Sequence, residues 1–335
     1  MALRFCDSFK HYATADLGTK WTTITGVPAI NATAGRWGTA CLNLADDSYY
    51  VAKTLDAQAT WIVGFAYRHP VWGAGLPIPV QFLDGTIVHV RLLIGADGLL
   101  HFQRGTTDIG LYASTPILQD VWYYLEVKVT IGDAPDGVAS LRINGVAELT
   151  QTGLDTRNAG NATANIVKMG GWAAATTYLD DLYICDGTGA ANNDYLGDIK
   201  VECLLPSADG ATVDWTASAG ADYTTVDEAL QNSDTDYISS STANQVDTFA
   251  MGNLATTAGT IKGVQYLLMA RKDDAGSRSV APVARPVSTD RVGATVSVAD
   301  TYAYVREIAE LNPEDTAAWE IADINGMEYG VKLIA

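Results

Sequence analysis

Residues 177–186 read Thr-Tyr-Leu-Asp-Asp-Leu-Tyr-Ile-Cys-Asp, and residues 195–202 read Tyr-Leu-Gly-Asp-Ile-Lys-Val-Glu. The first stretch is an alternating segment that ends in acidic residues, which is typical of a half-buried β-strand. The residues between the two stretches are small, polar and rich in Gly and Asn, as in a link between domains. We therefore interpret 177–186 as the last strand of one β-sandwich, and predict domains at residues 1–187 and 188–335.

The half of the chain before this link is built of similar segments. Apolar side chains recur at every second position over residues 61–68, 86–94 and 121–129. Asp84-Gly85 and Asn144-Gly145 are hairpin signals, because both central residues of a type I′ turn need positive φ. Helical periodicity is almost absent, so the sequence predicts an all-β protein of two antiparallel β-sandwich (jelly-roll) domains. In the second half it predicts strands at 198–205, 260–271, 277–285, 301–308 and 328–333.

Composition restricts the function classes. The chain has 335 residues, of which 48% are hydrophobic and 18% charged, and its formal net charge is −18. Such an acidic surface repels phosphate backbones, so we expect no nucleic-acid partner. No apolar run approaches the ~20 residues that span a bilayer, so we expect no membrane insertion. Residues 1–7 hold no apolar core of signal-peptide length, and we expect synthesis in a reducing cytoplasm.

The first half resembles the concanavalin A-like (laminin-G-like) jelly-roll superfamily over roughly residues 1–187. The residues that carry this resemblance are 120–127 (Asp-Val-Trp-Tyr-Tyr-Leu-Glu-Val), the Asn-Gly hairpin at 141–145 and the closing strand at 178–184. The whole chain is similar to virion structural proteins of tailed bacteriophages, in which such a domain runs through an Asp-Gly link into a second sandwich. Further matching features lie at 195–198, 234–237, 271–276 and 312–319.

This resemblance implies a non-enzymatic structural component of a tailed-phage virion, made in the host bacterial cytoplasm. It would be a capsid decoration or a neck, tail or baseplate protein. We expect a homo-oligomer, a trimer or larger, that docks on other virion proteins. The alternative is a glycan-binding module for host adhesion on the same scaffold, and a third hypothesis is a polysaccharide depolymerase.

Catalytic constellations are hard to find in the sequence. A glycosidase needs two carboxylates at close range, and the Glu-x-Asp-x-Glu pattern of jelly-roll glycanases does not occur. Asp180 and Asp181 are the nearest analogue, but adjacent residues on a strand point to opposite faces. His89 and His101 lie on consecutive predicted strands and could approach each other as a metal pair, although rim positions are the simpler interpretation. We therefore predict that the protein is not an enzyme.

Two kinds of binding site remain. Laminin-G-like domains often hold a cation on loop and strand-end oxygens, so the resemblance points to calcium at Asp180, Asp181 and Asp186. The same residue types also serve simply as turn formers. Carbohydrate binding uses exposed aromatic rings, for which the candidates are Tyr50, Trp72 and Trp172.

Overall fold

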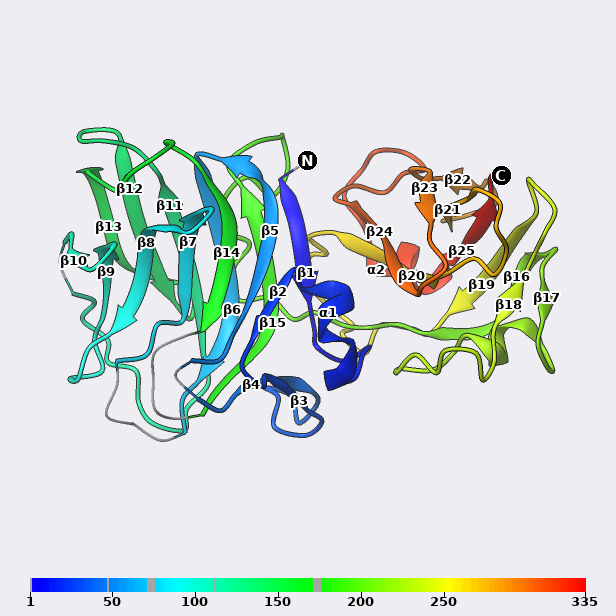
Figure 1. Ribbon diagram of the computed structural model, residues 1–335, viewed down its shortest axis with the longest axis horizontal. Coiled ribbons are helices and arrows are strands. Elements are labelled where there is room, and N and C mark those ends of the chain that lie inside the picture. Colours follow the sequence, from blue (N-terminus) through cyan, green and yellow to red (C-terminus); the bar gives the residue numbers. More distant parts are fainter. Residues whose placement is uncertain (1, 47, 71–75, 111, 171–175) are drawn as a thin grey trace. The chain divides into compact units, whose positions relative to one another are not determined.

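The computed structural model describes residues 2–46, 48–70, 76–110, 112–170 and 176–335. The chain divides into two compact units, Met1–Val201 and Glu202–Ala335. Both consist almost wholly of antiparallel strands, which confirms the all-β prediction (Figure 1). None of the helices in the described part of the chain is long and apolar enough to cross a bilayer. These short helices are η1 (Thr14–Asp16), α1 (Leu17–Lys20), η2 (Asp222–Thr225) and α2 (Ile321–Gly326).

The first unit is a sandwich of two sheets. The eight-stranded sheet has the order β13-β12-β11-β6-β15-β4-β3, with β1 paired to β15. The seven-stranded sheet has the order β10-β9-β8-β7-β14-β5-β2. The strands of the eight-stranded sheet are β1 (Leu3–Asp7), β3 (Ala29–Asn31), β4 (Cys41–Leu44), β6 (Thr60–Arg68), β11 (Tyr123–Thr130), β12 (Gly137–Ile143), β13 (Val146–Leu154) and β15 (Thr177–Asp186). Those of the seven-stranded sheet are β2 (Thr23–Thr25), β5 (Tyr50–Gln58), β7 (Val80–Asp84), β8 (Ile87–Ile94), β9 (Leu100–Arg104), β10 (Thr107–Asp108) and β14 (Ala164–Gly170).

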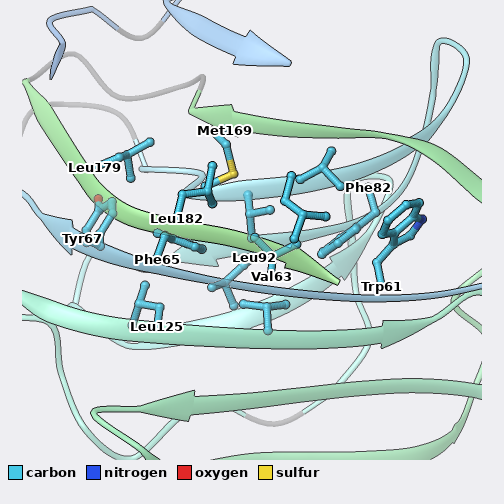
Figure 2. Close-up of a cluster of buried hydrophobic side chains, with 14 of the residues drawn as sticks. Trp61, Val63, Phe65, Tyr67, Phe82, Leu92, Leu125, Met169, Leu179 and Leu182 are labelled. Carbon is cyan, nitrogen blue, oxygen red and sulfur yellow. The ribbon is translucent and has the colours of Figure 1, made fainter. Parts of the chain in front are cut away.

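The core of this unit lies between the two sheets. Alternate residues of each strand meet there, as the period-two pattern predicts. Each fully buried apolar side chain stabilises the fold by about 1.5–3 kcal/mol. Figure 2 shows the middle of this core, in which every labelled side chain is at most 1% exposed: Trp61, Val63, Phe65, Tyr67, Phe82, Leu92, Leu125, Met169, Leu179 and Leu182.

Strand β6 departs from its predicted half-burial, because residues 61–67 are all buried. On its outer side the ring of Tyr183 lies over Gly64, where a Cβ would come within 2.0 Å of the ring. The Tyr183 hydroxyl donates to Glu126 Oε1 at 2.6 Å. The outer face of β6 is therefore packed, not solvated.

The connecting segment, residues 187–201, supplies much of this cover. The backbone N–H of Gly197 donates to Glu126 Oε1 at 2.8 Å, and that of Val201 donates to Asp181 Oδ1 at 2.8 Å. The segment therefore belongs to the first unit, and the division after Val201 falls 14 residues (201 − 187) later than the predicted boundary. The strand predicted over 198–205 does not form. The carbonyls of Ile199 and Val201 instead accept hydrogen bonds from the side chains of Arg36 and Lys10.

The second unit is a smaller sandwich. Its six-stranded sheet has the order β16-β19-β25-β21-β22, with β23 paired to β21, and two-stranded ladders join β17 to β18 and β20 to β24. Tyr266 of β20 stacks on Tyr329 of β25 with ring centroids 4.9 Å apart, so this ladder packs against the larger sheet. The strands are β16 (Pro206–Val213), β17 (Thr216–Ala217), β18 (Ile238–Ser239), β19 (Val246–Met251), β20 (Val264–Ala270), β21 (Arg278–Arg285), β22 (Arg291–Val292), β23 (Val296–Val298), β24 (Ala303–Ala309) and β25 (Glu328–Leu333).

Candidate functional site

The outer face of the seven-stranded sheet carries a continuous row of polar side chains. The strand registers pair Lys168 with Gln81, Gln81 with Arg91, Arg91 with Gln103, and Gln103 with Asp108. We call these five residues the cationic row. Their strand neighbours, such as Val80, Phe82 and Phe102, point into the core, so period-two alternation turns the row outward.

Hydrogen bonds fix the amides within the row. Arg91 donates to Gln103 Oε1 through Nε at 2.9 Å and through Nη2 at 2.6 Å. Gln103 in turn donates through Nε2 to Asp108 Oδ1 at 2.7 Å. Gln81, which is only 4% exposed, donates through Nε2 to the carbonyl of Gly170 at 3.2 Å. The row is therefore organised before any ligand arrives.

Lys168 is the least compensated cation of the row. Its Nζ lies 3.8 Å from the centre of the Tyr50 ring, and it makes no salt bridge with the residues that the structure describes. Burial lowers the pKa of Lys168, and burial also lowers that of Arg91 against an opposing effect of Asp108. Two partly desolvated cations with one carboxylate at the far end make this face attractive to an anion.

His101 and Tyr112 adjoin the Asp108 end of the row. His101 Nε2 lies 3.2 Å from Asp108 Oδ1, and the Tyr112 hydroxyl donates to Asp108 Oδ2 at 3.2 Å. The two rings lie 4.3 Å apart, and the negative charge of Asp108 raises the pKa of Tyr112. Tyr112 is 46% exposed, whereas His101 is only 3% exposed. The phenol ring is therefore available to a ligand and covers the imidazole.

Of the three predicted carbohydrate-binding aromatics, Tyr50 is part of this site through its contact with Lys168. Trp72 and Trp172 lie outside the described residues. The suggested His89–His101 pair does not assemble. His101 pairs with Leu93, four residues from His89 along β8, which is about 13 Å. His89 is buried and accepts the N–H of Asn158 at 3.1 Å.

The three aspartates of β15 serve the protein's own contacts. Asp180 accepts the N–H of Arg36 at 2.9 Å, and Asp181 accepts Trp37 Nε1 at 2.8 Å. Asp186 is paired with Arg4. No group of three His, Cys, Asp or Glu side chains is placed to hold a metal ion in the described part of the chain. Calcium binding at these aspartates stays a prediction that these contacts do not support.

Asp180 and Asp181 lie at a β-bulge, which alternation alone does not anticipate. The register of β15 against β6 shifts between Asp180 and Tyr183, and Asp181 has φ of 48°. Burial, together with the neighbouring Asp181 carboxylate, raises the pKa of Asp180 to about 7. Both carboxyls hold the Arg36–Trp37 turn, so the strict opposition of adjacent side chains that the sequence implies does not apply here.

No protein-family model matches the chain, and no curated protein sequence matches it. Among solved structures, the chain is similar to a marine alginate lyase from Aplysia kurodai (12% identity, TM-score 0.42), with 55% of this chain and 98% of that chain covered. It is similar to an endo-β-1,4-glucuronan lyase from the fungus Trichoderma reesei (10%, TM-score 0.38, 49% and 90% covered). It is also similar to domain 4 of an extracellular arabinanase from Geobacillus stearothermophilus in complex with arabinotriose (14%, TM-score 0.37, 55% and 94% covered).

These findings correct two expectations. The prediction of a non-enzymatic structural component of a phage virion is wrong, because the similar structures are polysaccharide lyases and a glycosidase domain. The prediction that the protein is not an enzyme is contradicted by the same structures. The predicted β-sandwich fold is confirmed by the structure, and the link to phage particles has no support.

Proposed function

We propose that the first unit binds an acidic polysaccharide along the cationic row. The observation that carries this proposal is the placement of Lys168 and Arg91 on one outward face, two strands apart, with an ordered amide between them. Adjacent strands are about 4.8 Å apart, so the backbones of these two residues are separated by about 10 Å. Carboxylates on successive sugars of a polyuronate can match such a spacing.

The other groups of the site suit the sugar rings. The half-buried side chain of Gln103 presents an amide group, which is a common partner of ligand hydroxyls, whereas the buried Gln81 orders the row between the two cations. The exposed ring of Tyr112 offers an apolar face for stacking at one end of the row. The alginate and glucuronan lyases named above act on acidic polysaccharides, which agrees with this ligand class.

Isothermal titration calorimetry with alginate, polyglucuronate and neutral arabinan tests the proposal. We expect the two polyuronates to bind, with an affinity that falls as salt rises, and arabinan not to bind. Lys168→Met should weaken binding about tenfold or more, because it removes a charge-assisted contact. Lys128→Met is the matched control, since Lys128 lies on the eight-stranded sheet and pairs with Asp194. Unchanged polyuronate affinity in Lys168→Met, or no binding at all, contradicts the proposal.

A second candidate is cleavage of the bound chain by β-elimination, and the His101–Asp108–Tyr112 cluster beside the row favours it. A base removes the proton next to the uronate carboxylate, the electron pair forms a C=C bond, and the glycosidic C–O bond breaks. The leaving oxygen then takes up a proton. A nearby cation stabilises the negative charge that develops on the carboxylate.

In that reaction Arg91, which is nearer to the His101–Asp108–Tyr112 cluster, would hold the carboxylate of the reacting sugar, and Lys168 would hold that of another sugar. Tyr112 and His101 would move the protons. The ultraviolet absorbance of the unsaturated uronate product gives a direct assay. If elimination occurs, His101→Ala should remove product formation and retain binding. Absence of absorbance change with both polyuronates excludes cleavage of them and leaves the binding proposal to the calorimetry.

A further inference from the structure

In the second unit, the buried carboxyl group of Asp247 lies against the half-buried side chain of Asp222. Asp247, in the middle of the six-stranded sheet, is 0% exposed. Its Oδ1 accepts the N–H groups of Asp214 at 2.9 Å and Trp215 at 3.2 Å. The side chain of Asp222 lies within hydrogen-bonding reach of the Asp247 carboxyl group. The Oδ2 atoms of both carboxyls are buried and receive no donor from the described residues.

Two deprotonated carboxylates in this position would repel each other without a compensating cation. Asp247 makes no salt bridge within the described ranges, and neither does Asp222. One proton shared between the two Oδ2 atoms satisfies both and removes the repulsion, as in other close carboxyl pairs. A metal ion is the poorer explanation, because the described residues provide no third acidic, His or Cys ligand there.

The surrounding charged groups do not replace that proton. Asp209 accepts the backbone N–H of Tyr223 at 2.7 Å, and Asp214 accepts that of Val246 at 3.0 Å. On β25, which pairs with β19, the charged residues near Asp247 are Glu328, which accepts Thr248 Oγ1 at 2.7 Å, and Lys332, which pairs in register with Val246. Three more carboxylates nearby favour protonation of the pair, and Lys332 opposes it.

Asp222 also begins η2, so the pair connects a loop to the sheet. Residues 214–240 contain only η2 and the two-residue strands β17 and β18. A segment with so little regular structure opens locally at low free energy unless side chains hold it. Thr225 of η2 is nevertheless 3% exposed, which shows how closely this turn packs.

We propose that the Asp222–Asp247 pair is a proton-operated latch, which keeps η2 docked beside β19 while one proton is shared and releases it when that proton is lost. Burial, together with the neighbouring Asp222, raises the pKa of Asp247 to about 7. Because this pKa is raised in the folded state, the contribution of the pair to stability is complete at acid pH and is lost as pH rises through neutrality. The latch therefore closes in acid and opens in mild alkali.

Hydrogen–deuterium exchange of the full chain tests the latch, with rates corrected for intrinsic exchange at each pH. Between about pH 5.5 and pH 8.5 we expect protection of residues 222–226 to fall about tenfold or more in the wild type. Asp222→Asn supplies a permanent N–H donor to Asp247, so protection of residues 222–226 should stay high at both pH values in this variant. Asp180→Asn, in the first unit, is the control and should retain the wild-type response of this segment.

Two results would overturn the proposal. One is equal protection of residues 222–226 at both pH values in the wild type, and the other is the same loss in Asp222→Asn as in the wild type. Because Asp222 is only half-buried, this variant should fold, which circular dichroism checks. Repeating the exchange with calcium and with EDTA separates a proton from a cation, since a change in protection with calcium at alkaline pH would assign the pair to a metal instead.

Discussion

Lys20→Met should destabilise the first unit severely, because Lys20 belongs to a buried charge network near the N-terminus. Lys20 is 4% exposed and Asp7 is 0% exposed, and Nζ lies 3.0 Å from Asp7 Oδ1. Asp7 also accepts the Tyr12 hydroxyl at 2.7 Å and Trp21 Nε1 at 3.2 Å. Lys20 Nζ further contacts His11 Nε2 at 2.9 Å. The substitution leaves the carboxylate buried without its cation.

The magnitude follows from the burial of both partners. Removal of one partner from a buried ion pair costs about 3–5 kcal/mol, whereas replacement of both by apolar or neutral groups costs much less. For a unit of this size each kcal/mol lowers Tm by about 2–4 °C. We therefore expect Lys20→Met to lower Tm by about 6–20 °C. Asp7→Asn combined with Lys20→Met should recover part of that loss.

Urea unfolding and differential scanning calorimetry of the full chain measure these changes. Lys128→Met is the matched control, because its partner Asp194 is largely exposed and such pairs contribute about 0–1 kcal/mol. A loss below about 1 kcal/mol in Lys20→Met would refute the reasoning. The reasoning would also be refuted if the losses of Lys20→Met and Asp7→Asn simply added up in the double variant. Additive losses would mean that the two charges are not coupled.

Three further predictions concern packing and pH. Gly64→Ala should cost about 1–3 kcal/mol in urea unfolding, because its Cβ would collide with the Tyr183 ring; stability within error of the wild type would show that the ring moves freely. Leu125→Ala in the core should cost about 2–5 kcal/mol, and Val146→Ala, at a 63% exposed edge position, about 0.5 kcal/mol or less; similar losses at both sites would contradict the assigned burial. The pKa of Asp180 in the folded protein is raised to about 7, so its contribution to the free energy of unfolding is complete below about pH 4 and disappears as pH rises to neutrality. Asp180→Asn should flatten that part of the profile of stability against pH. An unchanged profile would reject the assignment.

Period-two patterning predicts several of the longer strands of this protein correctly, because burial of one face is a local property of the sequence. Residues 328–333 are predicted and observed as a strand, and residues 277–285 differ from the observed strand by one residue. The strand at residues 164–170 is not predicted, so the position of Lys168 on a strand is not predicted either. Its sequence Ala-Asn-Ile-Val-Lys-Met-Gly is short and only weakly alternating.

The candidate site depends on long-range register, which a single sequence does not encode locally. Alternation correctly places Arg91 opposite the apolar face of its strand. It does not reveal that Lys168, Gln81 and Gln103, from three other strands, lie in the same row. Likewise, nothing local in the aspartate-rich strand end reveals the bulge at Asp181. The sequence therefore predicts a binding site at the acidic residues, whereas the row of ordered cations is evident only from the folded sheet.

The connecting segment has a practical consequence for dissection of this protein. A fragment that stops at Asp186 would strip Glu126 and Asp181 of the backbone donors from Gly197 and Val201. It would also uncover the buried Tyr183, whose hydroxyl accepts the N–H of Leu196 at 3.1 Å, so we expect it to aggregate during purification. A fragment that continues through Val201 keeps the connecting segment in place, and is the fragment with which to measure sugar binding in isolation.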